Sequence, residues 1–153
     1  MEWKKELEQG LTALPADISK KFELIDAYSW QAPDITTNSI AACIDHTLLK
    51  SSATKEQIVK LCDEAKKFHF YSVCVNPAWL VFTKEQVKDS NVKVAITTNF
   101  PLGSCNLKLQ VDEVKQVIGE GADEIDYVFP FSLLVSKEYE RAFEQVQKIK
   151  EAC

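Results

Sequence analysis

The sequence has no hydrophobic run that approaches the roughly 20 apolar residues needed to span a bilayer. Its opening, MEWKKELEQG, is charged and lacks the apolar region of a signal peptide. We therefore expect a protein that stays in the cytosol and does not bind membranes.

Positive charge is also scarce. The chain carries 18 Lys and Arg against 23 Asp and Glu, which gives a formal net charge of -5, and its pI is about 5.1. Nucleic acids and anionic membranes require clustered Lys and Arg, so this composition argues against both as general partners. A small molecule or another protein is the expected partner.

Signatures of metal and nucleotide binding are absent as well. The five cysteines form no CxxC pair and there are only two histidines, so the ligand spacings of a zinc site are missing. Four cysteines lie among apolar residues, where a free thiol packs as a small hydrophobic group. No G-x-G-x-x-G or G-x-x-x-x-G-K-[ST] sequence occurs. We expect reduced cysteines, no metal and no cofactor.

What the sequence does have is the composition of a soluble domain, with 46% hydrophobic and 27% charged residues. Residues 1–38 carry apolar side chains at helical spacing on both sides of Pro15, which predicts two short helices in an N-terminal extension. The turn-forming segment QAPDITTNS separates this extension from a domain at residues 39–153. The apolar residues of the extension are Trp3, Leu7, Leu11 and Leu14, then Phe22, Leu24, Ile25, Tyr28 and Trp30.

From Ile40 onward, a short apolar run, a loop and an amphipathic helix recur as a unit. This recurrence is typical of a parallel sheet covered by helices. It predicts strands at residues 40–44, 71–75, 92–98 and 124–129. Four units suit either a small open α/β binding domain or half of an eight-stranded barrel, which needs about 250 residues, and periodicity does not choose between them.

The helices between these strands have recognisable ends. Thr54 and Gln57 predict a capping box, Asn76 can cap a helix that begins at Pro77, and Gly121 is placed to end the third helix. The last helix is expected after residue 136. The predicted apolar faces are Ile58, Leu61, Cys62, Ala65 and Phe68, then Leu109, Val111, Val114, Val117 and Ile118, and finally Tyr139, Ala142, Phe143, Val146 and Ile149.

Two acidic residues stand in apolar surroundings, Asp45 in ACIDHTLL and Asp126 in DEIDYVFP. A buried carboxylate without partners is costly. Both are expected toward the C-terminal ends of strands, where parallel α/β proteins hold their active sites. The carboxylates therefore either take part in chemistry or cap loop N–H groups and pair with lysines, and the pattern leaves both interpretations open.

Other polar residues near the strands have plainer interpretations. Because side chains alternate along a strand, His46 should point away from Asp45 and is expected to be structural. Cys74, in SVCVNP, could face the aspartates as an inert pocket-lining residue. The lysines nearest to strands or loops are Lys50, Lys93 and Lys108, and none is expected inside an apolar strand, where desolvation would favour an imine-forming amine.

Four segments, IDHTLLKSSAT, YSVCVNPAW, TTNFPLG and GADEIDYVFP, occur in the order and spacing of the first four strand–loop regions of the deoxyribose-phosphate aldolases. Together they are far more specific than one short motif. The resemblance covers residues 44–153 and implies an α/β fold, a partial TIM (β/α)8 barrel of about four strand–helix units.

The resemblance also implies chemistry. The family is a metal-free class I aldolase that reversibly cleaves 2-deoxy-D-ribose 5-phosphate to glyceraldehyde 3-phosphate and acetaldehyde through a lysine Schiff base. Asp126 matches the family's aspartate that acts with a water in a proton relay, and Asp45 matches the first-strand aspartate that helps to hold the lysine. Thr47, Leu49 and Cys74 match residues close to the substrate. Imine chemistry requires such a positioned acid–base group.

Part of the family's site has no counterpart in these 153 residues. The family takes its Schiff-base lysine from the sixth strand, a second lysine from the seventh, and its phosphate-binding loops from the seventh and eighth. We therefore expect a truncated aldolase without turnover as an isolated chain. Alternatively, two open edge strands and an uncovered inner face of Ile, Val and Phe favour a non-catalytic half barrel that self-associates or binds a full-length relative.

Overall fold

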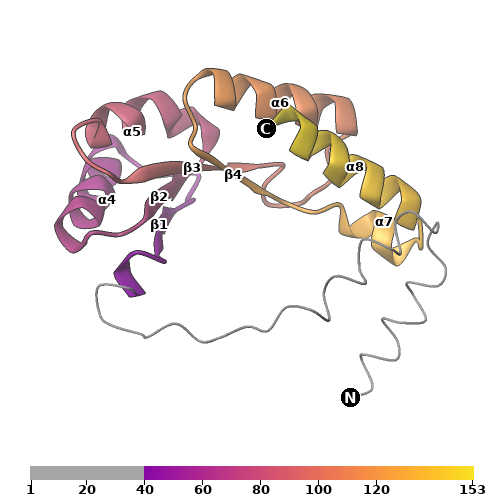
Figure 1. Ribbon diagram of the computed structural model, residues 1–153, viewed down its shortest axis with the longest axis horizontal. Coiled ribbons are helices and arrows are strands. Elements are labelled where there is room, and N and C mark those ends of the chain that lie inside the picture. The colour runs from indigo at the N-terminus through magenta and orange to yellow at the C-terminus, as the bar shows by residue number, and fades with distance from the viewer. Residues whose placement is uncertain (1–39) are drawn as a thin grey trace, which may run out of the picture. The chain divides into compact units, whose positions relative to one another are not determined.

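The structure is a computed structural model that describes residues 40–153. The two helices predicted for residues 1–38 lie outside the described residues. Four parallel strands form one sheet in the order β1-β2-β3-β4 (Figure 1). The elements are β1 (Asp45–Leu48), α4 (Lys55–Phe68), β2 (Ser72–Val75), η2 (Pro77–Trp79), α5 (Leu80–Val87), β3 (Lys93–Thr98), α6 (Leu107–Gly119), β4 (Glu124–Tyr127), α7 (Phe131–Val135) and α8 (Tyr139–Ala152).

The prediction of the first strand was wrong, whereas the other three strands are confirmed to within two residues at each end. Ile40 and Ala41 form a helical turn, in which the N–H groups of Cys43 and Ile44 donate to their carbonyl groups at 2.9 and 3.1 Å. Those N–H groups are therefore not available to a sheet. The strand begins at Asp45, where pairing with Ser72 of β2 becomes possible.

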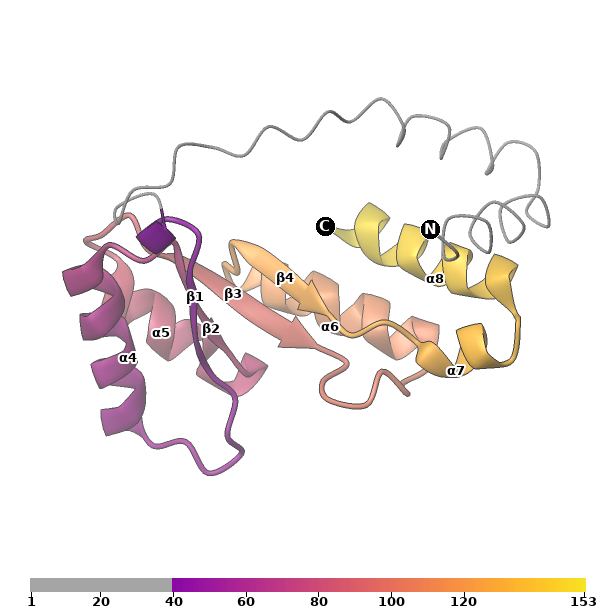
Figure 2. The same ribbon diagram turned by 90° about the horizontal axis from the view of Figure 1, so that it is seen from below.

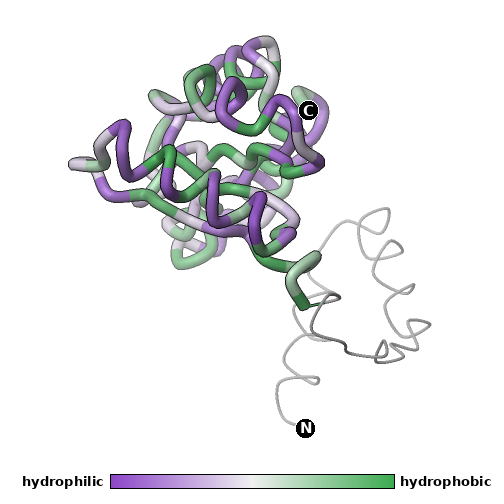
Figure 3. Tube along the Cα trace, turned by 90° about the vertical axis from the view of Figure 1, so that its left-hand side faces the viewer, coloured by the Kyte–Doolittle hydropathy of each residue, from purple (hydrophilic) through white to green (hydrophobic). Residues whose placement is uncertain are grey.

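The core lies between one face of the sheet and the helices. The β-branched residues of β2 and β3 that alternate toward this face pack against α4 and α5 and against Val117 of α6. In the hydropathy colouring of Figure 3, hydrophobic positions recur among hydrophilic ones along the helices, as expected for helices with one buried face. The buried strand residues are Val73, Val75, Val94 and Ile96, and the helix residues facing them are Ile58, Leu61, Cys62, Ala65, Leu80 and Val87.

The predicted helix ends are confirmed in part. The Thr54 hydroxyl accepts from Gln57 N at 3.4 Å, and Gln57 Oε1 accepts from Thr54 N at 3.0 Å, so the capping box is present. Gly121 has φ +99, as the residue after a helix end requires. Pro77 begins a short 3-10 helix, but Asn76 does not cap it, because its side-chain amide donates to Leu49 O at 3.1 Å instead.

The apolar faces predicted for α6 and α8 were partly wrong. Gln110 and Gln145 are buried, whereas Leu109, Tyr139 and Val146 are exposed. The two glutamines satisfy each other, since Gln145 Nε2 donates to Gln110 Oε1 at 2.7 Å. A search for apolar residues misses a polar pair of this kind, because paired polar groups can be buried at little cost.

The exposure of Phe68 in α4 also differs from the prediction. The five-residue helix α7 was not predicted at all. Within residues 40–153, no helix is both long and apolar enough to cross a membrane.

Candidate functional site

The face of the sheet opposite the helices is lined by polar and small side chains. The pairing register places Thr47, Cys74, Ala95 and Glu124 in one row across the four strands. Because side chains alternate along each strand, Asp45 and Asp126 belong to the same face as this row. We call it the inner face. The predicted inner face of Ile, Val and Phe was wrong, because these residues cover the helix side of the sheet and form the core.

Asp45 is held by a neighbouring strand. Ser72, which is fully buried, donates its hydroxyl to Asp45 Oδ1 at 2.5 Å. The Thr47 hydroxyl donates to the carbonyl oxygen of Asp45 at 2.8 Å. Asp45 is the first residue of β1, so the prediction that it lies toward the C-terminal end of a strand was wrong.

Asp126 has a different environment. It is the third of the four residues of β4, toward the C-terminal end as predicted, and it is exposed. Its neighbour across the strand pair is Thr97. The Thr97 hydroxyl is buried and has no hydrogen-bond partner among the described residues. A carboxylate that is exposed and lies beside an unused hydroxyl is free to contact a water or a substrate group.

Cys74 lies on the inner face, and the charges of both aspartates affect the pKa of its thiol. Its side chain is 4% exposed. Burial raises the pKa of the Cys74 thiol to about 11, the negative charges of Asp126 and Asp45 add to this rise, and a hydrogen bond with Thr47 opposes it. The thiol is therefore uncharged near neutral pH and is not a nucleophile there. Leu49, the remaining residue of the predicted site, follows β1 and accepts the hydrogen bond from Asn76.

The two aspartates do not pair directly. They lie on β1 and β4, the strands at opposite edges of the sheet (Figure 2). Three strand spacings of about 4.8 Å separate these edges along a flat sheet. The inner face thus carries an exposed carboxylate at each edge, of which Asp45 accepts a hydrogen bond from Ser72, with Cys74 between them.

One of the lysines nearest to the predicted strands lies in a strand, as the predicted range 92–98 implies. Lys93 is the first residue of β3, opposite Ser72. Its side chain is 50% exposed, and its Nζ lies 3.9 Å from Asp123 Oδ1. A half-exposed ammonium group beside a carboxylate is not desolvated, so Lys93 lacks the environment of an imine-forming amine.

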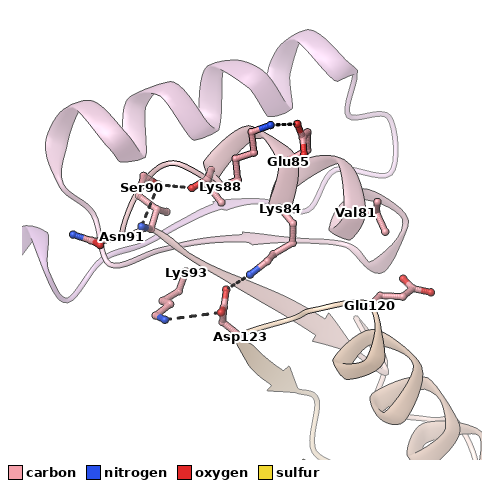
Figure 4. Close-up of a pocket in the computed structure, with 11 residues that line it drawn as sticks. Val81, Lys84, Glu85, Lys88, Ser90, Asn91, Lys93, Glu120 and Asp123 are labelled. Atoms are coloured by element: carbon pink, nitrogen blue, oxygen red, sulfur yellow. Dashed lines mark hydrogen bonds and ion pairs between the residues drawn. The ribbon is translucent and has the colours of Figure 1, made fainter.

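One cavity lies away from Asp126. It has a volume of about 690 Å³ and is lined by α5, by the segment that follows α5, and by residues at the N-terminal ends of β3 and β4 (Figure 4). Its cations are paired, because Lys84 Nζ lies 2.9 Å from Asp123 Oδ2 and Lys88 bonds to Glu85. The lysines that line this cavity all lie within 4 Å of a carboxylate, so it offers no unpaired cation to a phosphate group and is not the candidate site.

His46 is structural, as predicted, and lies on the helix side of β1. Its Nε2 contacts Glu64 Oε2 of α4 at 2.8 Å, and its ring packs edge-on against Phe70. The hydrogen bond with His46 lowers the pKa of the Glu64 carboxyl. Within residues 40–153, no group of three or more His, Cys, Asp or Glu is placed to hold a metal ion.

Sequence reasoning missed Ser72 and Asn99. Ser72 gave no signal, because a serine at the start of an apolar strand is common. Asn99 has φ +57, a left-handed conformation that asparagine adopts more readily than most residues. Its place between a strand and the turn FPLG is the signal that could have identified it.

Comparisons with known proteins agree with this arrangement. Residues 39–153 match the model of the DeoC/LacD family aldolases. The chain is 46% identical over 115 residues to the deoxyribose-phosphate aldolase of Caldicellulosiruptor saccharolyticus, covering 75% of this chain and 52% of that protein. It is 49% identical over 109 residues to the deoxyribose-phosphate aldolase of Clostridium botulinum strain Loch Maree, covering 71% and 51%.

Solved structures show the same relation. A Coccidioides immitis protein described as a deoxyribose-phosphate aldolase superposes with a TM-score of 0.77 at 29% identity, over 99% of this chain and 56% of that one. The deoxyribose-phosphate aldolase of Aeropyrum pernix, which is tetrameric, gives a TM-score of 0.60 at 29% identity, over 72% and 50%. The chain spans about half the length of the curated relatives it matches, and its four strand–helix units form part of a TIM barrel. This chain belongs to the DeoC/LacD aldolase family.

Proposed function

We propose that this chain supplies the first half of a deoxyribose-phosphate aldolase barrel, and with it the acid–base part of a class I aldolase site. The observation that carries the proposal is the inner face, where Asp45, Thr47, Cys74 and Asp126 meet on one side of the sheet. The substrate class is 2-deoxy-D-ribose 5-phosphate, by analogy with the relatives. The activity belongs to deoxyribonucleotide breakdown in the cytosol.

Asp126 is the proposed acid–base group. In the cleavage direction, a water that contacts the Asp126 carboxylate takes the proton of the β-hydroxyl group of the lysine Schiff base. The carbon–carbon bond then breaks, glyceraldehyde 3-phosphate leaves, and the bonding electron pair stays with the other fragment as an enamine. The enamine carbon must then gain a proton before water hydrolyses the imine and releases acetaldehyde. An exposed carboxyl group working with a water can deliver that proton.

Asp45 has a different proposed role. A carboxylate that already accepts a hydrogen bond from Ser72 is fixed in orientation. Such a group is suited to holding a lysine ammonium or a water in place. Thr47, Leu49 and Cys74 are proposed to line the substrate pocket beside it.

The nucleophilic lysine is proposed to come from strands beyond the four described here. Lys93 lies in a strand of the described part, but it is half exposed and lies beside Asp123. A polypeptide of these 153 residues is therefore expected to show no turnover by itself.

The test is borohydride trapping with acetaldehyde, followed by intact-mass analysis of the purified chain. No adduct is expected. The same chain should then be combined with the second half of the Caldicellulosiruptor saccharolyticus aldolase, where an adduct and turnover are expected, and Asp126→Asn should abolish the turnover. An adduct on the isolated chain that disappears in Lys93→Ala would contradict the proposal and identify Lys93 as the nucleophile.

A second candidate function is that of a non-catalytic half barrel that associates with itself or with a full-length relative. The open edges favour it, because β1 and β4 each pair with only one strand within residues 40–153. Unpaired edges invite pairing with another chain. The outcome that would support this candidate is a defined oligomer in light scattering that forms no imine even when the second half is supplied.

Charge argues against self-association in particular. Among the residues of the four described strands, the inner face carries the carboxylates of Asp45, Glu124 and Asp126 and one lysine, Lys93. A ring of two copies would enclose this acidic set twice. Like charges in an enclosed space of low dielectric repel one another strongly, so a partner with cationic inner strands suits the face better.

A further inference from the structure

The side chain of Asn99 joins the loop between β3 and α6 to the end of β4 through hydrogen bonds. Asn99 Nδ2 donates to the carbonyl oxygen of Val128 at 3.1 Å, and Asn99 Oδ1 accepts from Cys105 N at 3.0 Å. The backbone of Asn99 is held as well, because its N–H donates to Glu113 Oε2 of α6 at 3.1 Å and its carbonyl accepts from Gly103 N at 2.9 Å. Asn99 therefore joins β3, the loop, α6 and the segment after β4.

The loop between β3 and α6 is in close backbone contact with the end of β4 at Gly103. Gly103 has φ +62, and a Cβ added to it would lie 2.5 Å from Phe129 O and 3.1 Å from Val128 Cγ1. A residue larger than glycine would push the loop away from this segment. The hydrogen bond from Asn99 to Val128 thus lies within a close backbone contact.

Few other hydrogen bonds hold the end of β4 in place. Val128 N donates to Thr98 O at 3.2 Å, which continues the pairing with β3 beyond Tyr127. Within residues 40–153, no strand pairs with the other edge of β4. Val128 lies two residues after Asp126, so a contact that fixes Val128 limits how far the exposed carboxylate of Asp126 can move.

We infer that Asn99 is a positioning residue of the candidate site, which sets the place of Asp126 by holding the end of β4 against the β3–α6 loop. The inference rests on the proposed function in that it takes Asp126 as the acid–base group. Asn99 acts through the backbone and does not itself touch the reacting atoms.

Cys74 provides a readout that does not depend on turnover. Part of the rise in the pKa of its thiol comes from the charge of Asp126, so Asp126→Asn should lower the pKa of Cys74. We would measure this pKa by NMR titration of the 153-residue chain labelled with 13Cβ-cysteine. If Asn99 positions Asp126, Asn99→Gly should lower the pKa of Cys74 in the same direction, by at least half of the Asp126→Asn effect. Glycine keeps the left-handed backbone and removes only the side chain.

The double variant and a matched control separate positioning from general loss of stability. Asn99→Gly should have no further effect on the pKa of Cys74 in the Asp126→Asn background. The control is Asn106→Gly in the same loop, which removes the cap that accepts from Leu109 N at 3.1 Å but no bond to Val128. It should destabilise α6 and leave the pKa of Cys74 unchanged.

Two results would overturn the inference. One is an Asn99→Gly variant in which the pKa of Cys74 is unchanged or shifts equally with and without Asp126. The other result is measured on the unchanged chain, so it does not depend on whether the variant folds. It would be that the side-chain amide protons of Asn99 exchange with water as fast as those of Asn106. A chain that shows no aldolase turnover with a supplied second half would contradict the proposed function and would leave these measurements intact.

Discussion

Asp45 and Asp126 lie on the same face of the sheet, but their hydrogen bonds suit them to different tasks. Both carboxylates are exposed, but Asp45 accepts from the buried Ser72 hydroxyl, whereas Asp126 lies beside the Thr97 hydroxyl, which has no hydrogen-bond partner among the described residues. A group that holds a charge in place needs a fixed orientation, and a group that transfers a proton needs access to water and substrate. These environments support our proposal that Asp45 holds a charge in place and that Asp126 transfers a proton.

The hydrogen bond from Ser72 to Asp45 predicts a measurable loss of stability when the Ser72 hydroxyl is removed. Ser72→Ala removes the hydroxyl that donates to Asp45, and the side chain is fully buried. We expect the free energy of unfolding in urea to fall by about 1 kcal/mol, the usual value of such a hydrogen bond. Ser104→Ala, at an exposed position, is the control and should be neutral. A Ser72→Ala variant as stable as the unchanged chain would show that the contact contributes nothing to folding.

The lowered pKa of the Asp123 carboxyl predicts that the stability of the fold depends on pH. Burial alone would raise the pKa of its carboxyl, but the hydrogen bonds from Lys84 and Val94 N–H and the charges of Lys84 and Lys93 outweigh burial and lower it. A lowered folded-state pKa stabilises the fold above the unfolded-state value of about 3.9, and this stabilisation is lost as the pH falls through the folded-state value.

The test compares Asp123→Asn with the unchanged chain in urea unfolding at several pH values. The variant should be less stable by about 1 kcal/mol at pH 7, a value reduced by partial solvent screening. The difference should shrink as the pH falls below about 4, because the carboxyl of the unchanged chain is then protonated. Asp112→Asn, exposed on α6, is the control. A difference that stays constant with pH would mean that the charge of Asp123 does not matter.

At the scale of the elements, the sequence predicted best where a local signal decided the structure. The capping box of Thr54 and Gln57 and the left-handed Gly121 both depend on residues within a few positions of one another. The strands at residues 71–75, 92–98 and 124–129 were predictable because short segments rich in apolar residues recur between amphipathic helices.

The failures come from contacts made at long range. The first strand was misplaced because its start depends on pairing with β2, which residues 40–44 alone do not reveal. The buried face of α8 was misread because Gln145 is buried only through its partner Gln110, which is 35 residues away. The composition of the inner face was misjudged for the same reason, since only the register shows which alternate residues lie under the helices.

The buried amides predict coupling between α6 and α8. Gln110 Oε1 accepts from Gln145 Nε2 at 2.7 Å and from the Tyr127 hydroxyl at 3.1 Å. Gln110→Met should cost about 1 to 3 kcal/mol, because it removes the acceptor of the buried Gln145 Nε2. Gln145→Met should cost about 1 kcal/mol, because Gln110 keeps its hydrogen bond from the Tyr127 hydroxyl. The double variant should cost less than the sum of the two, since it removes both members of the pair.

A double-mutant cycle in urea unfolding measures this coupling. Gln147→Met, on the exposed side of the same helix, should change stability little. Strictly additive costs for Gln110 and Gln145 would show that the amide pair is not a unit.

At the scale of the whole molecule, four strands curve around an inner face that no other described element covers. The helices occupy the other side of the sheet, and within residues 40–153 the two edge strands each pair with only one neighbouring strand. The candidate site therefore lies on the face between two edges at which another chain could pair. We propose that the acidic charge of this face influences which partner pairs there.

The inner-face carboxylates are expected to oppose association between two copies of the chain. Glu124 and Asp126 lie on the inner face near the free edge of β4. If their repulsion opposes pairing between two copies, the Glu124→Gln and Asp126→Asn double variant should form dimers with a Kd at least tenfold lower than that of the unchanged chain, which corresponds to about 1.4 kcal/mol.

Sedimentation of both chains at low and high salt measures this. The difference should narrow at high salt, because screening weakens the repulsion in the unchanged chain. Glu120→Gln, next to the C-terminal end of α6 and outside the four strands, removes the charge of a carboxylate and should leave the Kd unchanged. An equal Kd for the unchanged chain and the double variant would mean that the free hydrogen-bonding groups of the edge strands, rather than the inner-face carboxylates, govern association.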